Sequence, residues 1–171
     1  MPEGNPEAYG PHPTEMLRNR NIQALLRTIR YAEGTDEPDG YGTTFTHQKF
    51  DNNAPHPKVI YRGGGEESDA HGAYQFLSTT WEMVHGGKNV PMTSETQDMA
   101  ALQLISNRGI DARAPITREG IDKLGWEWAS LPNLKGLSHY GQPSKTYDEL
   151  YDYYQKQLTR PEYATGYFTG P

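Results

Sequence analysis

The sequence predicts an α+β fold that is mostly helical and carries a small antiparallel β-sheet. Apolar residues recur at helical spacing in several segments, and each segment begins at a residue that caps helices well. The stretch 35–67 is instead dense in Gly, Thr, Asn, Asp and Pro and contains short β-prone runs. Thirteen prolines and eighteen glycines in 171 residues argue against an all-helical bundle.

The first predicted helix runs from about Thr14 to Gly34. Its apolar residues fall at spacings close to a helical period, at Leu17, Ile22, Leu25, Leu26 and Ile29. Gly34 provides a stop signal, so Glu33 is expected at the C-terminal end of a half-buried helix. Residues 1–13 contain four prolines and two glycines and are expected to form a flexible N-terminal arm. Residues 14–171 are expected to form a single domain.

The remaining elements follow from β-prone runs and helix caps. The sheet is expected within residues 35–67, at the runs 41–45 and 58–61. Three helices, at about 79–86, 94–107 and 146–158, are marked by capping boxes, namely Thr79 with Glu82, Ser94 with Gln97, and Thr146 with Glu149. A fourth, at about 117–128, has Thr117 as its N-cap and an apolar stripe of Ile121, Leu124 and Trp128. The three tryptophans, Trp81, Trp126 and Trp128, are expected in the core.

Composition excludes several classes of function. The chain has no cysteine, so no disulfide or thiolate metal site is possible, and its six histidines show no metal-binding pattern such as HExxH. No metal or cofactor is therefore expected. A net charge of −6 argues against broad nucleic-acid binding, because that binding depends on neutralising phosphates. No apolar run is long enough for a signal peptide or a membrane span, so no membrane insertion is expected.

Glu33 is the residue whose position best suits catalysis. It ends an apolar helix just before a glycine-rich, sheet-like segment, where its carboxyl can be desolvated and its pKa raised. A general acid that works at neutral pH needs such a pKa. The same position is also typical of an ordinary solvated glutamate, so the local pattern leaves both interpretations open.

Short motifs that follow one order along the chain resemble the lambda-type phage endolysins. Segment 32–35 (AEGT) resembles the family's Ser-Glu-Gly-Thr catalytic element, and segment 68–81 (SDAHGAYQFLSTTW) resembles its Gly-x-Tyr-Gln region. Further matches are HPK at 56–58, SETQD at 94–98 with ALQ at 101–103, WASLP at 128–132 and YGQ at 140–142. Collinear agreement thus runs from about residue 22 to residue 158.

The resemblance implies a lysozyme-like fold, with the sheet lining a substrate cleft, and lytic transglycosylase activity on peptidoglycan. Glu33 would be the catalytic acid and base, cutting the β-1,4 bond between N-acetylmuramic acid and N-acetylglucosamine and leaving a 1,6-anhydro end. Gln75 is expected to bind sugar or orient Glu33, and Tyr74 to line the cleft floor. Tyr41, Tyr140 and Gln142 are expected to contact the glycan. The structural alternatives are a core position for Tyr74 and a bond from Gln75 to buried backbone.

Two other functions stay open at this point. The loop between Glu33 and Tyr41 is shorter than in lambda-like relatives, and Gly42 stands where the lambda protein has an acid. A hydrolytic muramidase that uses a second acid such as Asp39 to activate water is therefore an alternative. The acidic charge and the proline-rich arm also fit a virion structural or wall-binding component whose lysozyme-like domain is weak or inactive.

The expected partner is the glycan strand of bacterial peptidoglycan, which the protein would bind as a monomer. Because no signal peptide is apparent, the protein is expected to be made in the host cytoplasm and to act on the wall in the periplasm. It would reach the wall through a holin-dependent membrane pore, or be carried in the virion with tail components.

Overall fold

The computed structural model describes residues 13–161 of the chain. The predicted arm at residues 1–13 falls outside this range, apart from Pro13, which begins the short helix α1 (Pro13–Met16). The described part contains no helix that is both long and apolar enough to cross a membrane.

Helix α2 (Arg20–Glu33) is the central element and ends at the residue that the sequence singled out. It begins after Asn19, whose side chain accepts hydrogen bonds from the backbone N–H groups of Asn21 and Ile22. It ends at Gly34, which takes the left-handed conformation (φ 74°) that glycine adopts without strain. The expected continuous helix from Thr14 is thus wrong at its start, because the Asn19 cap separates α1 from α2.

Four more helices follow: α3 (Ser78–Val84), α4 (Ser94–Asn107), α5 (Arg118–Leu124) and α6 (Tyr147–Leu158). Thr117 and Thr146 are confirmed as N-caps, accepting hydrogen bonds at 3.0 and 3.2 Å from backbone N–H groups three residues later. The caps predicted at Thr79 and Ser94 are wrong. Thr93 caps α4, while α3 begins at Ser78 with no side-chain cap. Helix α5 also ends earlier than expected, at Leu124 instead of near Trp128.

The sheet is a single antiparallel hairpin of β1 (Tyr61–Gly63) and β2 (Glu66–Ser68). Gly63 pairs with Glu66 across a two-residue turn, Gly64–Gly65, whose φ angles of 60° and 81° suit glycine. Only the end of the predicted run 58–61 enters a strand. The predicted run 41–45 instead begins within a 3₁₀ turn, η2 (Gly40–Gly42), and forms isolated bridges at Thr43 and Thr44. The predicted α+β class, mostly helical with a small antiparallel sheet, is confirmed.

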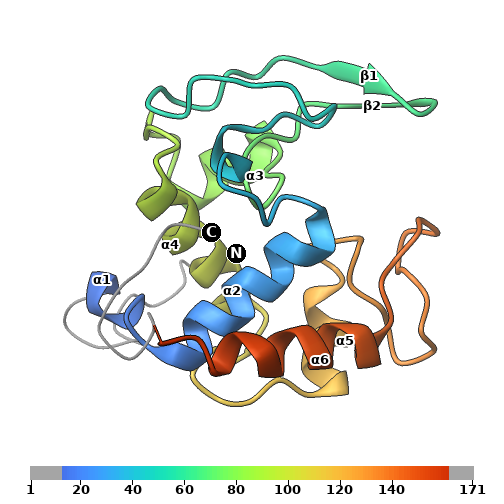
Figure 1. Ribbon diagram of the computed structural model, residues 1–171. Helices are drawn as coiled ribbons and strands as arrows, with labels where there is room; N and C mark the ends of the chain where they lie inside the picture. Colours follow the sequence, from blue (N-terminus) through green and yellow to red (C-terminus); the bar gives the residue numbers. More distant parts are fainter. Residues whose placement is uncertain (1–12, 162–171) are drawn as a thin grey trace.

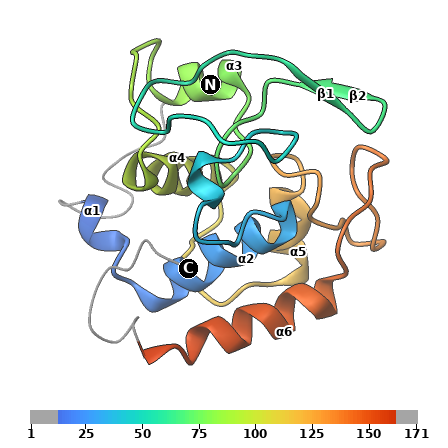
Figure 2. The same cartoon turned by 45° about the horizontal axis from the view of Figure 1, so that its top comes forward.

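The core forms around α2, which lies between α6 on one side and α4 on the other (Figures 1 and 2). Helix α2 buries Leu25, Leu26 and Ile29 almost completely, and α6 contributes Leu150 and Tyr154. The hairpin projects from the end of the molecule opposite α6, on the side toward which α2 runs to its last residue, Glu33 (Figure 1). The buried helix therefore provides a rigid base for Glu33, while the hairpin is an exposed arm.

A buried polar network fixes the end of α2 to α4. The Arg30 guanidinium donates to the Tyr74 hydroxyl at 2.8 Å, and that hydroxyl donates to the Asp98 carboxylate on α4 at 2.6 Å. Tyr41 donates to the same carboxylate at 2.8 Å. Asp36 lies 3.3 Å from Arg27 and 3.8 Å from Arg30, so it neutralises charge on the helix. The segment that follows α2 is therefore bound to α2 through Asp36 and to α4 through Tyr41.

Replacing Asp98 by alanine is expected to lower the free energy of unfolding by about 3–5 kcal/mol, because it leaves the buried Arg30 charge without one of its partners. Chemical denaturation of the variant and the wild type measures this difference. Asp152→Ala is the control, since it removes an exposed partner of Lys156 on α6 and should cost less than about 1 kcal/mol. Equal effects of the two substitutions would contradict a structural role for the network.

Candidate active site

Glu33 lies in a cavity of about 470 Å³ between the hairpin and the chain that follows α5. One wall comes from β2 and the start of α3, and the other from residues 126–130 and 140–143. In Figure 1 these segments lie on the side of the molecule toward which the C-terminal end of α2 points. The lining residues are Glu33, Phe45, Glu66, Glu67, Ser68, Ala70, Gln75, Leu77, Thr80, Trp126, Glu127, Trp128, Ala129, Ser130, Tyr140, Gln142 and Pro143.

The Glu33 carboxyl is half-buried and has one hydrogen-bond partner in the described part of the chain, the Ser130 hydroxyl, which donates to Oε1 at 2.7 Å. Burial raises the pKa of Glu33 to about 7, while the bond from Ser130 acts in the opposite direction. Glu33 can therefore hold a proton near neutral pH and still release it, as a general acid must.

The turn after Glu33 is fixed by two hydrogen bonds from Thr35 to backbone carbonyls. The Thr35 N–H donates to the Arg30 carbonyl at 2.9 Å, and the buried Thr35 hydroxyl donates to the Ala73 carbonyl. The chain thus leaves α2 sharply at Gly34 and does not cover the carboxyl. The result is an acid at the edge of the core with one side open to the cavity.

Ser130 is held against Glu33 by its own neighbours. The indole N–H of Trp128 donates to the Tyr74 carbonyl at 3.0 Å, and the Lys145 N–H donates to the Ser130 carbonyl at 3.1 Å. Ser130 lies within the WASLP motif, but no role was predicted for it. No local pattern reveals it, because Ser130 and Glu33 are 97 residues apart in the chain.

Three of the predicted glycan-contacting residues reach this cavity: Gln75, Tyr140 and Gln142. Gln75 has a positive φ of 50°, and its side-chain amide donates to the Gly72 carbonyl at 2.8 Å. The Gln75 amide oxygen makes no hydrogen bond within residues 13–161, so it can accept one from a ligand. Tyr140 is exposed, and its hydroxyl donates to the Trp126 carbonyl at 2.5 Å.

The structure does not bring Tyr74 or Tyr41 to the cavity. Tyr74 is fully buried and its hydroxyl is used by Arg30 and Asp98, so the expected position on the cleft floor is corrected to the core. Tyr41 lines a separate hollow of about 450 Å³ and donates to Asp98. Burial raises the pKa of both phenols above the ordinary tyrosine range. Both therefore act as uncharged members of the network under α2.

Asp39 also lies outside the cavity. It lines the same separate hollow as Tyr41 and forms an ion pair with Lys49. The acids that do share the cavity with Glu33 are Glu66, Glu67 and Glu127, none of which was predicted as a site residue. Glu67 pairs with Arg62 at 2.9 Å and Glu127 with Arg108 at 2.8 Å.

The expectation that all three tryptophans lie in the core is wrong for Trp126. Trp81 and Trp128 are buried as predicted, at 2% and 3% exposure, but Trp126 is 47% exposed and lines the cavity. The predicted helix through residue 128 had placed Trp126 inside a helical segment. Because α5 ends at Leu124, Trp126 instead lies in the following turn.

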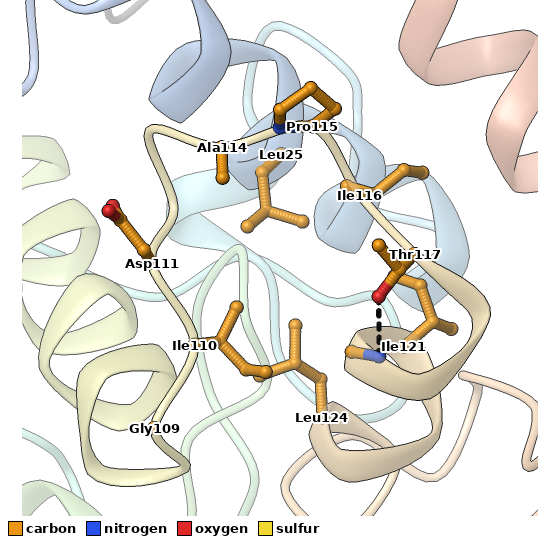
Figure 3. A pocket seen from close by; sticks show the side chains of 11 residues that line it. Leu25, Gly109, Ile110, Asp111, Ala114, Pro115, Ile116, Thr117, Ile121 and Leu124 are labelled. Atoms are coloured by element: carbon orange, nitrogen blue, oxygen red, sulfur yellow. Dashed lines mark hydrogen bonds between the residues drawn. The ribbon is translucent and has the colours of Figure 1, made fainter.

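A second, smaller cavity of about 170 Å³ lies between α2, α5 and the chain from Gly109 to Thr117 (Figure 3). Its walls are mostly apolar, with Leu25, Ile110, Ile121 and Leu124 facing it (Figure 3). The Thr117 hydroxyl is used as the cap of α5, and the Asp111 carboxylate pairs with Arg113 at 2.9 Å. This cavity offers no free acid or base. Residues 13–161 also contain no group of three or more His, Asp or Glu that could hold a metal ion.

Comparison with solved structures defines the class of fold. The chain is similar to bacteriophage lambda lysozyme in complex with a chitohexasaccharide, with a TM-score of 0.70, 27% identity, and coverage of 81% of this chain and 94% of the other. A second structure of lambda lysozyme gives a TM-score of 0.67 at 25% identity. The fold, together with a buried acid in a cleft, is that of a lysozyme-like glycosidase.

Comparison of sequences gives the family. The Endolysin family model matches residues 23–160, most of the chain. The endolysin of Escherichia phage P2 is 30% identical over 151 residues, covering 77% of this chain and 89% of the phage P2 protein. The chain therefore belongs to the endolysin family, and the predicted resemblance to lambda-type phage endolysins is confirmed. It is a lysozyme-like enzyme that degrades peptidoglycan.

Activity is expected to fall as the pH rises through about 7, because Glu33 must be protonated to act as an acid. Ser130→Ala removes the bond that lowers the pKa of Glu33, so the basic limb of the profile should move to higher pH. Initial rates on purified peptidoglycan between about pH 5 and 9 measure both effects. Thr80→Ala, which alters another hydroxyl residue lining the cavity, should leave the limb in place. An unshifted limb in Ser130→Ala would contradict this role for Ser130.

Glu33→Gln is expected to stabilise the fold at neutral pH. The folded-state pKa of Glu33 lies above its unfolded value, so the folded state binds more protons and loses stability as the pH rises from about 4.5 through about 7. Replacing the carboxyl by an amide avoids this loss of stability, which is on the order of 3 kcal/mol at pH 8. Thermal melts at pH 5 and pH 8 should show a gain in Tm that is larger at pH 8. A gain of the same size at both pH values would indicate another cause.

Proposed function

We propose that the protein is a peptidoglycan lytic transglycosylase, which cleaves the β-1,4 bond between N-acetylmuramic acid and N-acetylglucosamine. The observation that carries this proposal is the environment of Glu33, whose half-buried carboxyl faces the cavity with the Ser130 hydroxyl as its hydrogen-bond partner in the described part of the chain. Glu33 is the acid with a raised pKa in the cavity, and the second acid suggested by the sequence, Asp39, lies in a different hollow. A reaction in which one carboxyl serves as acid and then as base fits this arrangement.

In the first step the Glu33 carboxyl protonates the glycosidic oxygen that links the two sugars. The bond between that oxygen and the anomeric carbon of the muramic acid residue breaks, and the N-acetylglucosamine side leaves as an alcohol. Positive charge develops on the muramic acid ring, where its own acetamido oxygen can stabilise it. The Ser130 bond to Oε1 stabilises the carboxylate left behind and leaves Oε2 to face the leaving group.

In the second step the Glu33 carboxylate takes the proton from the hydroxymethyl group of the same muramic acid residue. The oxygen of that group bonds to the anomeric carbon and closes the 1,6-anhydro ring. Glu33 is thereby returned to its protonated form, and no water is consumed. The protein chiefly supplies orientation and desolvation, because the nucleophile is part of the substrate.

The substrate-binding residues are proposed from the cavity lining. Gln75 accepts a hydrogen bond from the glycan through its free amide oxygen, and Tyr140 and Gln142 contact the strand from the opposite wall. The protein acts as a monomer on glycan strands of the bacterial wall. It is made in the host cytoplasm and reaches the wall in the periplasm through a membrane pore, or is carried there by the virion.

A hydrolytic muramidase is the second candidate, and the observation that favours it is Glu66. This exposed residue of β2 lines the cavity and makes no ion pair within residues 13–161. Inverting hydrolases need a second carboxylate across the bond to activate water. Glu66 therefore replaces Asp39 as the residue to test for that role.

Digestion of purified peptidoglycan by the wild type is expected to give fragments that end in 1,6-anhydro-muramic acid. These fragments are lighter by one water than those made by a hydrolase, so mass spectrometry distinguishes the two reactions. Glu33→Gln should reduce the rate by at least about 100-fold, because general acid–base catalysis contributes about 10²–10⁴-fold.

Glu66→Gln and Asp39→Asn are the controls, since the first removes a negative charge from the cavity lining and the second removes one from the separate hollow, and neither changes Glu33. Each should keep the rate within about threefold of the wild type, because neither holds the reacting proton. Reducing muramic acid ends would overturn the transglycosylase proposal. Loss of activity in Glu66→Gln together with reducing ends would establish the hydrolase instead.

A further inference from the structure

Trp126 is a large apolar side chain left exposed on the wall of the cavity that holds Glu33. It is 47% exposed, whereas the other two tryptophans are almost completely buried. Exposure of an indole forfeits about 25 cal/mol for each square ångström of apolar surface left in water. An exposed apolar surface that continues into a polar cavity is typical of a ligand-binding site.

The Trp126 ring is held rigidly from behind. The His139 ring stacks on it, with centroids 3.9 Å apart and an angle of 23° between the planes. Tyr140 packs its ring edge-on at 5.9 Å and donates its hydroxyl to the Trp126 carbonyl at 2.5 Å. His139 is itself fixed by a bond of 2.7 Å between its Nε2 and the Asp122 carbonyl. The entropy of ordering the indole is thus already lost before a ligand arrives.

Gly125 makes room for this arrangement. A Cβ atom built on Gly125 would lie 2.8 Å from Cδ2 of His139 and 3.1 Å from the Leu131 carbonyl oxygen. The histidine ring therefore packs directly against the glycine backbone, at the end of α5. The turn that exposes Trp126 and the stack that supports it depend on the same residue.

The unsupported side of Trp126 is available to a ligand. No ring other than His139 and Tyr140 packs against it within residues 13–161, and its indole N–H has no hydrogen-bond acceptor there. The opposite wall carries the hydrogen-bonding groups of Glu66, Ser68 and Gln75, beside the apolar side chains of Ala70 and Leu77. The cavity thus has one wall with an exposed aromatic ring and one wall that offers hydrogen-bonding groups.

We propose that Trp126 is a stacking platform for one pyranose ring of the glycan strand and so determines how tightly the strand is bound. A pyranose presents an apolar face of C–H groups and an equatorial rim of hydroxyl and acetamido groups, which matches the two unlike walls. A flat aromatic ligand would leave the polar wall without partners. This inference rests on the proposed function, because it names where that function's substrate is held.

The test measures binding of chitohexaose in a Glu33→Gln background, so that the sugar is not cleaved during calorimetric titration. Trp126→Ala is expected to weaken the Kd about tenfold, and Trp126→Phe about threefold, because the smaller ring keeps part of the stacking surface. With Glu33 restored, Trp126→Ala should raise the KM for peptidoglycan by a similar factor and change kcat much less, as expected for binding that is equal in the ground and transition states.

Leu134→Ala is the matched control. Leu134 is 63% exposed on the same loop but does not line the cavity, so its removal should leave both the Kd and the KM unchanged. His139→Ala removes the support behind the indole and should weaken binding less than Trp126→Ala does. Circular dichroism identifies any variant that fails to fold. If Trp126→Ala does not fold, the Kd of Trp126→Phe is the measurement that tests the platform.

Wild-type affinity in Trp126→Ala would overturn the platform, and so would equal losses in Trp126→Ala and Leu134→Ala. Absence of chitohexaose binding by the parent protein would overturn it as well. The proposed chemistry is judged separately by the masses of the wild-type products. Reducing ends together with weakened binding in Trp126→Ala would support the platform and reject the transglycosylase. Anhydro ends together with unchanged binding would support the transglycosylase and reject the platform.

Discussion

The chemistry expected of the site depends on keeping one carboxyl group, that of Glu33, in a poorly hydrated position at the end of a buried helix. The C-terminal end of α2 carries the negative pole of the helix, which disfavours a carboxylate there, and burial acts in the same direction. Arg30, the buried cation one turn earlier, is committed to Asp98, Asp36 and Tyr74. The Arg30 charge is therefore neutralised within the network that fixes α2, and the bond from Ser130 is the contact that lowers the pKa of Glu33.

The aromatic residues of this region fall into two groups, one in the network that supports α2 and one on the wall of the cavity. Tyr74 and Tyr41 carry hydroxyls that complete the charged network, and they lie under the helix or beside a different hollow. Trp126 and Tyr140 belong to the chain after α5, which forms one wall of the cavity. The rigid support for Glu33 and this wall of the cavity thus come from separate parts of the chain. Substitutions on the exposed wall can alter binding without disturbing the acid.

Much of the helical framework could be predicted from the sequence because caps and apolar periodicity are local signals. The end of α2 at Gly34 and the starts of α5 and α6 followed directly from such signals. The functional surface could not be predicted in the same way. The bond from Ser130 to Glu33 joins distant segments, and the exposure of Trp126 depends on where α5 stops. The motif containing Tyr74 and Gln75 pointed to the right region, but adjacent residues in it face the core and the cavity respectively.

The hairpin β1–β2 contributes to the other wall of the cavity, yet it is the least supported element of the described fold. Each strand has three residues, the two glycines of its turn have no side chains to pack, and most of its residues are exposed. A two-stranded ribbon of this kind is only marginally stable in water. Glu33 is thus anchored to the buried helical core, while the opposite wall can loosen far below the melting temperature. Warming or mild denaturant should consequently impair the capture of glycan well before the helical core unfolds.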